Sequence, residues 1–185
     1  MRQILGMVVF GVLTFGLTGC TVPTNGITGV SVDDAGNLVV VLAWCGRQPD
    51  EVIIYHDRVN TTPVEDVPAD LASPISSSIV DAAYAAPRLA TGTASFRPDA
   101  PDKGWSARLM PSAFDPSVTY TAYGATNDNT YSTSPITFQM GDADALRRRP
   151  GTVLANRYDT RTWEEHDVFI PQAEFDRQGT EESCE

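Results

Sequence analysis

The sequence predicts an all-β domain of the sandwich type. Short β-prone runs follow one another along the chain and are separated by turn clusters, a spacing typical of two packed antiparallel sheets. One run, residues 38–45, is apolar on both faces, as in a strand that is covered on both sides. The chain has 185 residues, of which 42% are hydrophobic, and this suffices for one core of ordinary size.

The first twenty residues have the pattern of an export signal. Arg2 supplies a positive charge, and the uncharged run 4–17 is too short for a spanning helix, which needs roughly 20 residues. The run ends in Leu17-Thr18-Gly19-Cys20. This order resembles the bacterial lipoprotein signal, whose lipobox is an apolar residue, two small residues and a cysteine.

The resemblance implies cleavage between Gly19 and Cys20 and a diacyl lipid anchor, with palmitate, on Cys20. Two acyl chains hold a protein stably on a bilayer, so we expect the protein on the extracytoplasmic face of the cell membrane. The alternatives are a free cysteine beside an ordinary signal peptide, or a short membrane anchor.

The expected layout has four parts. Residues 1–19 form the signal peptide, 20–26 the lipidated N-terminus and tether, 27–141 the β-sandwich domain, and 142–185 a C-terminal extension packed on the sandwich. The formal charge of the whole chain is −11. Without Arg2 the mature chain has 12 basic and 24 acidic residues, a charge of −12, which disfavours nucleic-acid binding.

The first half of the domain contains three clear strand patterns. Residues 27–32 are β-prone and precede an Asp-, Gly- and Asn-containing turn; 38–45 form the strongest strand; and 51–56 follow the next turn. The stretch 57–87 differs, because four prolines interrupt it and it has no sustained period. We expect a long irregular excursion there, with one helical turn near 80–85.

Strand patterns then return at 88–96, 105–109, 118–125 and 136–140. The C-terminal extension mixes short elements. Residues 142–149 begin with acids and end with arginines before Pro150-Gly151, which predicts a short helix. Short strands are expected at 152–156 and 168–170, and one or two helical turns at 171–177.

The strand order resembles the fibronectin type III group of immunoglobulin-like domains, over roughly residues 26–140. The residues that carry the resemblance are Leu42-Ala43-Trp44, Ile54-Tyr55, Leu109-Met110-Pro111, Tyr120-Thr121-Ala122-Tyr123 and Ser134-Pro135-Ile136. The sequence departs from the family at Gly124, where an apolar residue is usual, and in the 57–87 excursion. The resemblance implies that Trp44 lies in the core between the sheets.

If Trp44 faces the core, then Val39, Val41 and Cys45 face the other way and need a cover. The segment 142–184 is available for this purpose. With Cys20 bound to lipid, Cys45 and Cys184 form an even pair in an oxidising compartment, which predicts a disulfide. The alternative is two unpaired thiols.

Residues for catalysis are sparse. No G-x-S-x-G nucleophile motif occurs, and His56 and His166 are the only histidines that could serve as bases. The acidic sets lack the spacing of a calcium loop, although a structural Ca²⁺ site stays an alternative; they are Asp33-Asp34, Asp99 with Asp102, Asp142 with Asp144, and Glu164-Glu165-His166-Asp167. We therefore predict no catalytic residues, no metal site and no cofactor.

Two further groups of side chains have competing interpretations. Arg147-Arg148-Arg149 are either cations at a helix C-terminus or contacts for anionic lipid headgroups. Several aromatic side chains are either parts of a recognition surface or partly buried in the sandwich; they are Tyr120, Tyr123, Tyr131, Trp105 and Trp163.

These features favour a non-enzymatic, lipid-anchored surface protein that binds another protein or a component of the cell envelope. The alternative is a small envelope hydrolase or carbohydrate-active module.

Replacement of the anchoring cysteine tests the localisation. We expect Cys20→Ala to release the protein from the membrane fraction or to leave its precursor uncleaved, because the acyl chains supply the attachment. Cell fractionation and the mobility of the precursor on gels measure both effects. A variant that is processed and fractionates like the wild type would contradict the lipid assignment.

Overall fold

The structure is a computed structural model that describes residues 22–58, 78–89, 92–159 and 161–182. Cys20, Cys184 and most of the 57–87 excursion lie outside these residues. The described chain is mostly β, as predicted. Its elements are β1 (Thr24–Val32), β2 (Leu38–Trp44), β3 (Glu51–Asp57), β4 (Ser78–Ala85), β5 (Thr93–Phe96), β6 (Ser106–Leu109), β7 (Tyr120–Ala125), β8 (Ser132–Ser134), β9 (Ile136–Phe138), α1 (Asp142–Arg147), β10 (Thr152–Asp159), β11 (Glu164–Pro171), α2 (Gln172–Arg177) and the π-helical turn η1 (Gln178–Glu182).

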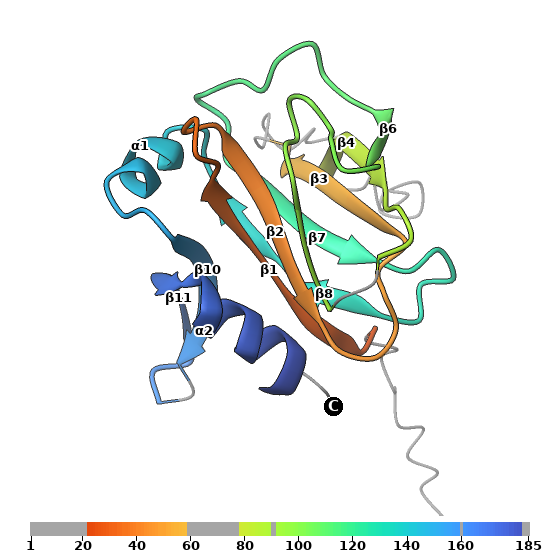
Figure 1. Cartoon of the computed structure of the whole chain (residues 1–185), viewed down its shortest axis with the longest axis vertical. Coiled ribbons are helices and arrows are strands. Elements are labelled where there is room, and N and C mark those ends of the chain that lie inside the picture. The colour runs from red at the N-terminus through yellow and green to blue at the C-terminus, as the bar shows by residue number, and fades with distance from the viewer. Residues whose placement is uncertain (1–21, 59–77, 90–91, 160, 183–185) are drawn as a thin grey trace, which may run out of the picture.

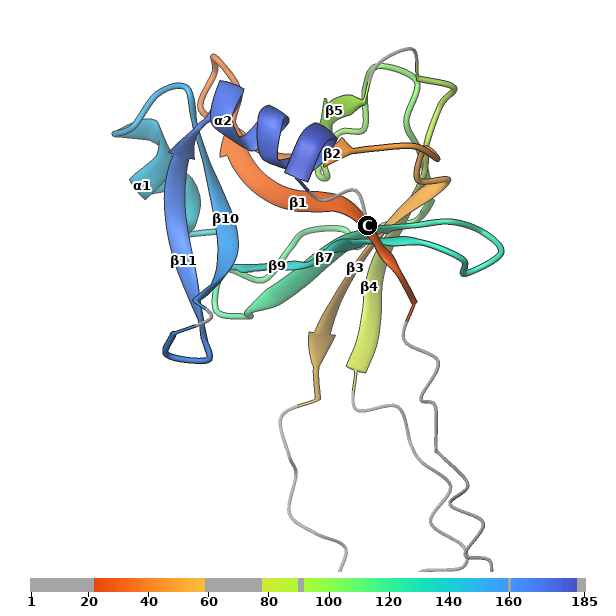
Figure 2. The same cartoon turned by 90° about the horizontal axis from the view of Figure 1, so that it is seen from below.

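The strands form one mixed sheet that curls over itself (Figures 1 and 2). In one half, β2 pairs with β1 and β5, and β1 pairs on its other side with β10, which pairs with β11. In the other half, β3 lies between β4 and β7, while β6 pairs with β4 and β9 with β7. The short strand β8 joins the halves, because it is parallel to β1 and antiparallel to β7.

The main core lies between the two halves. Leu38, Val40, Leu42 and Trp44 of β2 contribute one side, and the other half contributes residues such as Ile54. Trp44 is 4% exposed, so its side chain is buried as expected.

The opposite face of β2 is buried as well. Val39, Val41 and Ala43 form a second cluster with Phe175 of α2 and with Val153 and Ala155 of β10. All seven residues of β2 are buried in consequence. The cover that its two-faced apolar pattern requires comes from the C-terminal segment.

The C-terminal segment packs closely on the backbone of β1 and β2. A Cβ on Gly29 of β1 would lie 2.8 Å from a ring carbon of Phe175, and a Cβ on Gly179 of η1 would clash with Ala43. Glycine at these positions therefore lets α2 and η1 rest directly on β1 and β2.

Four elements differ from expectation. The prediction of a helical turn near 80–85 is wrong, because this segment is the strand β4. Ala82 and Tyr84 point into the core, and the backbone of β4 pairs with β3 and β6. The strand β8 was not expected. Strands β10 and β11 are longer than the predicted pieces and extend the sheet beyond β1, in addition to covering β2. The helix at 142–149 is confirmed as α1, and the helical turns at 171–177 are confirmed as α2.

The start of β1, Cys45 and the end of η1 lie at one end of the domain. Gly26 is paired with Trp44, and Sγ of Cys45 lies 3.2 Å from Oδ1 of Asn25. Thr180 of η1 approaches Gly92, whose carbonyl accepts a hydrogen bond from the Trp44 amide. Because Cys184 lies outside the described residues, its bond to Cys45 stays a prediction.

Removing the Phe175 ring tests the cover over β2. Phe175 is fully buried, so we expect Phe175→Ala to lower the free energy of unfolding by about 3–5 kcal/mol. Urea unfolding measures the change. As a control, Met110→Ala removes a side chain that is 45% exposed and should change stability by no more than about 0.5 kcal/mol. Equal small effects of both substitutions would contradict the packing.

Peptide mapping of the non-reduced mature protein tests the Cys45–Cys184 bond. We expect one disulfide-linked peptide pair, and a loss of as much as 4 kcal/mol in unfolding free energy for Cys184→Ser, because the bond closes a loop of more than a hundred residues. Alkylation of both thiols without reductant would contradict the bond.

Candidate functional site

The strongest candidate site is a groove on the outer side of β2. Two adjoining cavities, of about 330 and 270 Å³, share Val41, Ser95, Lys103 and Gln172 as lining residues. The first cavity also touches Leu89, Thr93, Ala94, Trp105 and Asp176; the second also touches Ser31, Val32, Asp33, Asp34 and Val39. These volumes are at the lower end of the range for ligand sites.

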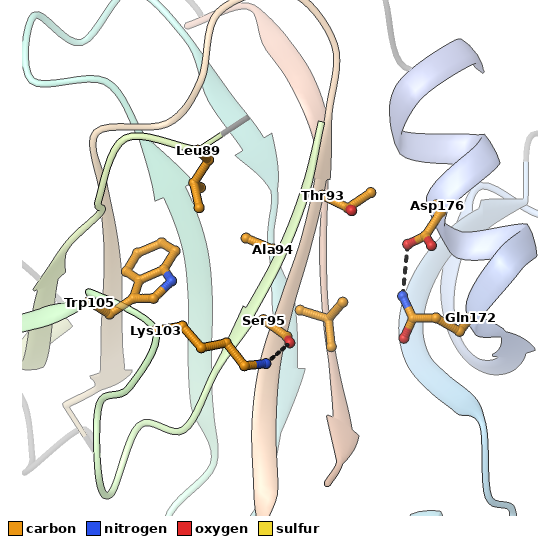
Figure 3. Close-up of a pocket in the computed structure, with 9 residues that line it drawn as sticks. Leu89, Thr93, Ala94, Ser95, Lys103, Trp105, Gln172 and Asp176 are labelled. Atoms are coloured by element: carbon orange, nitrogen blue, oxygen red, sulfur yellow. Dashed lines mark hydrogen bonds between the residues drawn. The ribbon is translucent and has the colours of Figure 1, made fainter. Parts of the chain in front are cut away.

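The walls of the groove come from distant parts of the chain (Figure 3). Gln172 and Asp176 of α2 stand on one side, and β5 with Lys103 and Trp105 on the other. Val39 and Val41 of β2 lie between them as an apolar floor. The groove is thus the part of the outer face of β2 that α2 leaves open.

Polar groups line the rim above this floor. Nζ of Lys103 donates a hydrogen bond of 3.1 Å to Oγ of Ser95, and Nε2 of Gln172 donates one of 2.7 Å to Oδ1 of Asp176. At the far end, Asp33 accepts hydrogen bonds from the side chain and amide of Asn37, which hold the pKa of Asp33 below its usual value. The rim therefore presents carboxylates, amide and hydroxyl groups, and a single ammonium.

Lys103 reaches this rim from an unusual turn. Its φ of 51° is in the left-handed region, and Gly104 follows with φ 88°. A lysine has no intrinsic preference for this conformation, and residues held in it often cluster at functional sites. The turn sets Lys103 beside Ser95.

The groove is suited to recognition. Its apolar floor with a few polar groups at the edge is the usual composition of a binding site. The exposed Lys103 places its Nζ 3.1 Å from Oγ of Ser95, and this pair is the polar contact at the centre of the rim.

The two predicted candidate bases lie elsewhere. Nδ1 of His56 is 2.6 Å from Oδ2 of Asp81, which joins β3 to β4, and the ring stands edge-on to Tyr120. Nε2 of His166 is 3.9 Å from Glu164 on the exposed strand β11. Among the described residues, no serine, threonine or cysteine is hydrogen-bonded to either histidine.

Members of different acidic sets approach one another, Asp142 near Asp167 and Asp33, Asp99 and Asp102 around Arg97. Strand alternation places Glu164 and His166 on one face of β11, and Glu165 and Asp167 on the other. Loss of hydration and the charges of Asp142 and Glu165 raise the pKa of Asp167. Within the described residues, no group of three or more histidine, cysteine, aspartate or glutamate side chains could hold a metal ion.

Arg147 and Arg149 are engaged within the domain. Arg147 donates to the carbonyl of Gly36 at 2.7 Å and pairs with Asp144, and Arg149 lies 4.1 Å above the ring of Phe169. These contacts favour the interpretation of the run as helix-end cations.

The predicted aromatic group divides into buried and exposed members. Tyr120 and Trp105 are core residues, 4% and 5% exposed, and Trp105 stacks on Phe96 with ring centroids 4.3 Å apart. Tyr131 is 37% exposed and Trp163 76%. Tyr123 is intermediate and contacts Tyr55 edge-to-face. Trp163 is therefore the most exposed member of the predicted aromatic group.

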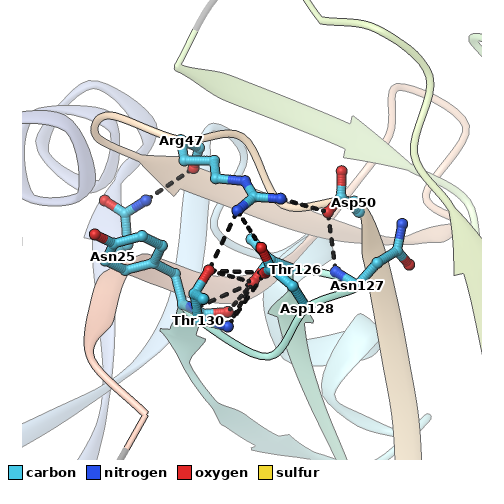
Figure 4. Close-up of polar contacts among 8 residues, drawn as sticks. Asn25, Arg47, Asp50, Thr126, Asn127, Asp128 and Thr130 are labelled. Atoms are coloured by element: carbon cyan, nitrogen blue, oxygen red, sulfur yellow. Dashed lines mark hydrogen bonds and ion pairs between the residues drawn. The ribbon is translucent and has the colours of Figure 1, made fainter.

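The end of the domain at which β1 begins is closed by a polar network (Figure 4). Arg47 pairs with Asp128 at 2.6 Å and with Asp50 at 3.6 Å, and Asn25 donates to the carbonyl of Arg47. Hydrogen bonds from Thr130 and Arg47 hold the pKa of Asp128 well below its usual range. The hollow between these loops has no room for a water molecule.

The comparisons with known proteins supply no relative. Neither a protein-family model, nor a curated protein, nor a solved structure matches the chain significantly. Among the described residues, every helix falls short of the length and apolarity that a membrane span requires.

Proposed function

We propose that this chain is a lipid-anchored, non-enzymatic protein of the extracytoplasmic face of the cell membrane, which binds a protein or another envelope component through the groove on β2. The observation that carries the proposal is the spacing between anchor and domain. Only three residues separate Cys20 of the lipobox from Thr24, the first residue of β1. Four residue steps reach about 14 Å at full extension, so the lipid holds the domain close to the bilayer.

The groove is compatible with this placement. Its second cavity is lined by Ser31 and Val32, at the end of β1 that is opposite to Thr24. Eight residue steps along a strand span roughly 26 Å. A ligand can therefore enter the groove away from the anchored end.

The domain is proposed to be an immunoglobulin-like sandwich of the fibronectin type III kind, and three contacts support this. Strand β2 pairs with β1 and β5, while β3 pairs with β4 and β7, as the two sheets of that fold require. Trp44 lies in the core between the halves. The hydroxyl of Tyr120, the first residue of β7, accepts a hydrogen bond of 2.8 Å from the amide of Asp115, which has the form of the tyrosine corner of these domains.

A small envelope hydrolase is the second candidate, because two side-chain pairs resemble parts of catalytic sites. They are His56 with Asp81, and Ser95 with Lys103. The two pairs belong to different halves of the sheet, and neither is a full set of nucleophile, base and orienting acid among the described residues. The binding function is therefore preferred.

Site-specific photo-crosslinking in intact cells tests the groove. A crosslinker at Ser95, on the rim, should yield a discrete adduct, whereas the same crosslinker at the exposed Thr137 of β9 should yield none. Filling the groove with Val41→Trp or Gln172→Trp should abolish the Ser95 adduct. Equal adducts from both positions would contradict the groove as the binding site.

A substrate screen separates the two candidates. The purified full-length protein should not turn over ester, glycoside or phosphate substrates. Turnover that is lost in Ser95→Ala or His56→Ala would establish the hydrolase instead.

A further inference from the structure

The hairpin of β10 and β11 carries an exposed aromatic pair at its tip. The two strands pair from Thr152 with Pro171 to Asp159 with Glu164, and β10 is fastened to β1 near the opposite end of the hairpin. Trp163 is 76% exposed, the highest value among the exposed large hydrophobic side chains of the described residues. Tyr158 and Val80 follow at 48% each. The rings of Trp163 and Tyr158 meet edge-to-face with centroids 6.2 Å apart.

The turn at the tip presents the indole and does not bury it. Trp163 has φ 61°, a left-handed conformation that is rare for a bulky side chain. Its amide donates a hydrogen bond of 2.8 Å to the carbonyl of Asp159, which closes the turn. Because folding gains little from a side chain so exposed, the strained position indicates a function for the indole.

The chemistry around the pair fits a lipid–water interface. Tryptophan and tyrosine are enriched at that depth, where an apolar ring with a polar edge is stable. The tip is close to neutral, with Arg157 and Arg161 against Asp159, Glu164 and Glu165. Burial of the rings, and not attraction to anionic headgroups, would therefore hold the tip at a membrane.

The position of the hairpin agrees with this chemistry. In Figures 1 and 2 the tip of the hairpin points to the lower edge of the domain, and so do the first residues of β1. The proposed anchor at Cys20, four residues before Thr24, would hold the bilayer at the same side.

We infer that Trp163 and Tyr158 form a second membrane contact, which inserts into the lipid–water interface beside the acyl chains on Cys20. This inference rests on the proposed function, because the anchor brings the bilayer to the hairpin. Two contacts, the lipid and the hairpin tip, fix the orientation of the domain on the membrane. One contact alone would leave it free to rotate about the tether.

Tryptophan fluorescence tests the inference directly. The other two tryptophans, Trp44 and Trp105, are 4% and 5% exposed, so changes in solvent or lipid contact report Trp163. The full-length lipidated protein is reconstituted in phosphatidylcholine vesicles, with or without brominated acyl chains. We expect the emission of the membrane-bound protein to be blue-shifted and to be quenched by the brominated lipid. Aqueous iodide should quench it several-fold less than it quenches the Cys20→Ala protein in detergent-free buffer.

Matched variants complete the design. Trp163→Phe should abolish the lipid-dependent quenching and still float with the vesicles, whereas Tyr131→Phe, at another exposed tyrosine, should behave as the wild type. Protein that floats but leaves Trp163 open to iodide overturns the hairpin contact alone. Protein that does not float overturns the anchor and the inference with it. Protection from iodide without quenching by brominated lipid would assign the tip to a contact between copies of this chain and would also overturn the inference.

Discussion

The burial of β2 on both of its faces is the constraint on which the rest of the structure depends. An isolated sheet strand with seven buried residues needs one apolar layer on each side. The inner face meets the second half of the curled sheet, and the outer face meets Phe175, Val153 and Ala155. The C-terminal segment is therefore part of the core and not an appendage, although it follows the last strand of the sandwich pattern.

The same constraint positions the candidate site. Because α2 has only six residues, it leaves a groove beside Val39 and Val41. Phe175 packs against Gly29, the strand partner of Val41, and Gly179 of η1 packs against Ala43. The outer face of β2 is thus closed near the start of β1 and open at the other end, beside Ser31 and Val32. The closed end is reinforced by Arg47 and Asp128, whose exposed ion pair contributes more to loop geometry than to stability.

Local sequence predicted the elements that carry their own pattern and missed those that depend on neighbours. The apolar run of β2 and the acid-to-arginine order of α1 are visible in a single segment, and both were predicted. The strand β8 has three residues, and its pairing with β1 and β7 exists only in the fold. The groove also depends on neighbours in the fold. Ser95, Lys103 and Gln172 share no sequence motif, and they meet only because β5, a left-handed turn and α2 converge. Trp105 and Trp163 both stand in polar sequence, yet Trp105 is buried because Phe96 offers it a stacking surface.

The acidic net charge of the chain gives a reason for the two membrane contacts that we propose. A mature chain with twice as many acidic as basic residues is repelled by the anionic lipids of a cell membrane. The acyl anchor that we propose would overcome this repulsion on its short tether, but it would not choose which face of the domain approaches the bilayer. Arg147 and Arg149 are held by Asp144, Gly36 and Phe169, so these cations have other partners. The tip of the hairpin has two arginines against three carboxylates, a net charge of −1, and it exposes the indole of Trp163. With that tip in the interface, as we propose, the groove beside Ser31 and Val32, at the opposite end of β1 from Thr24, would stay open to a ligand.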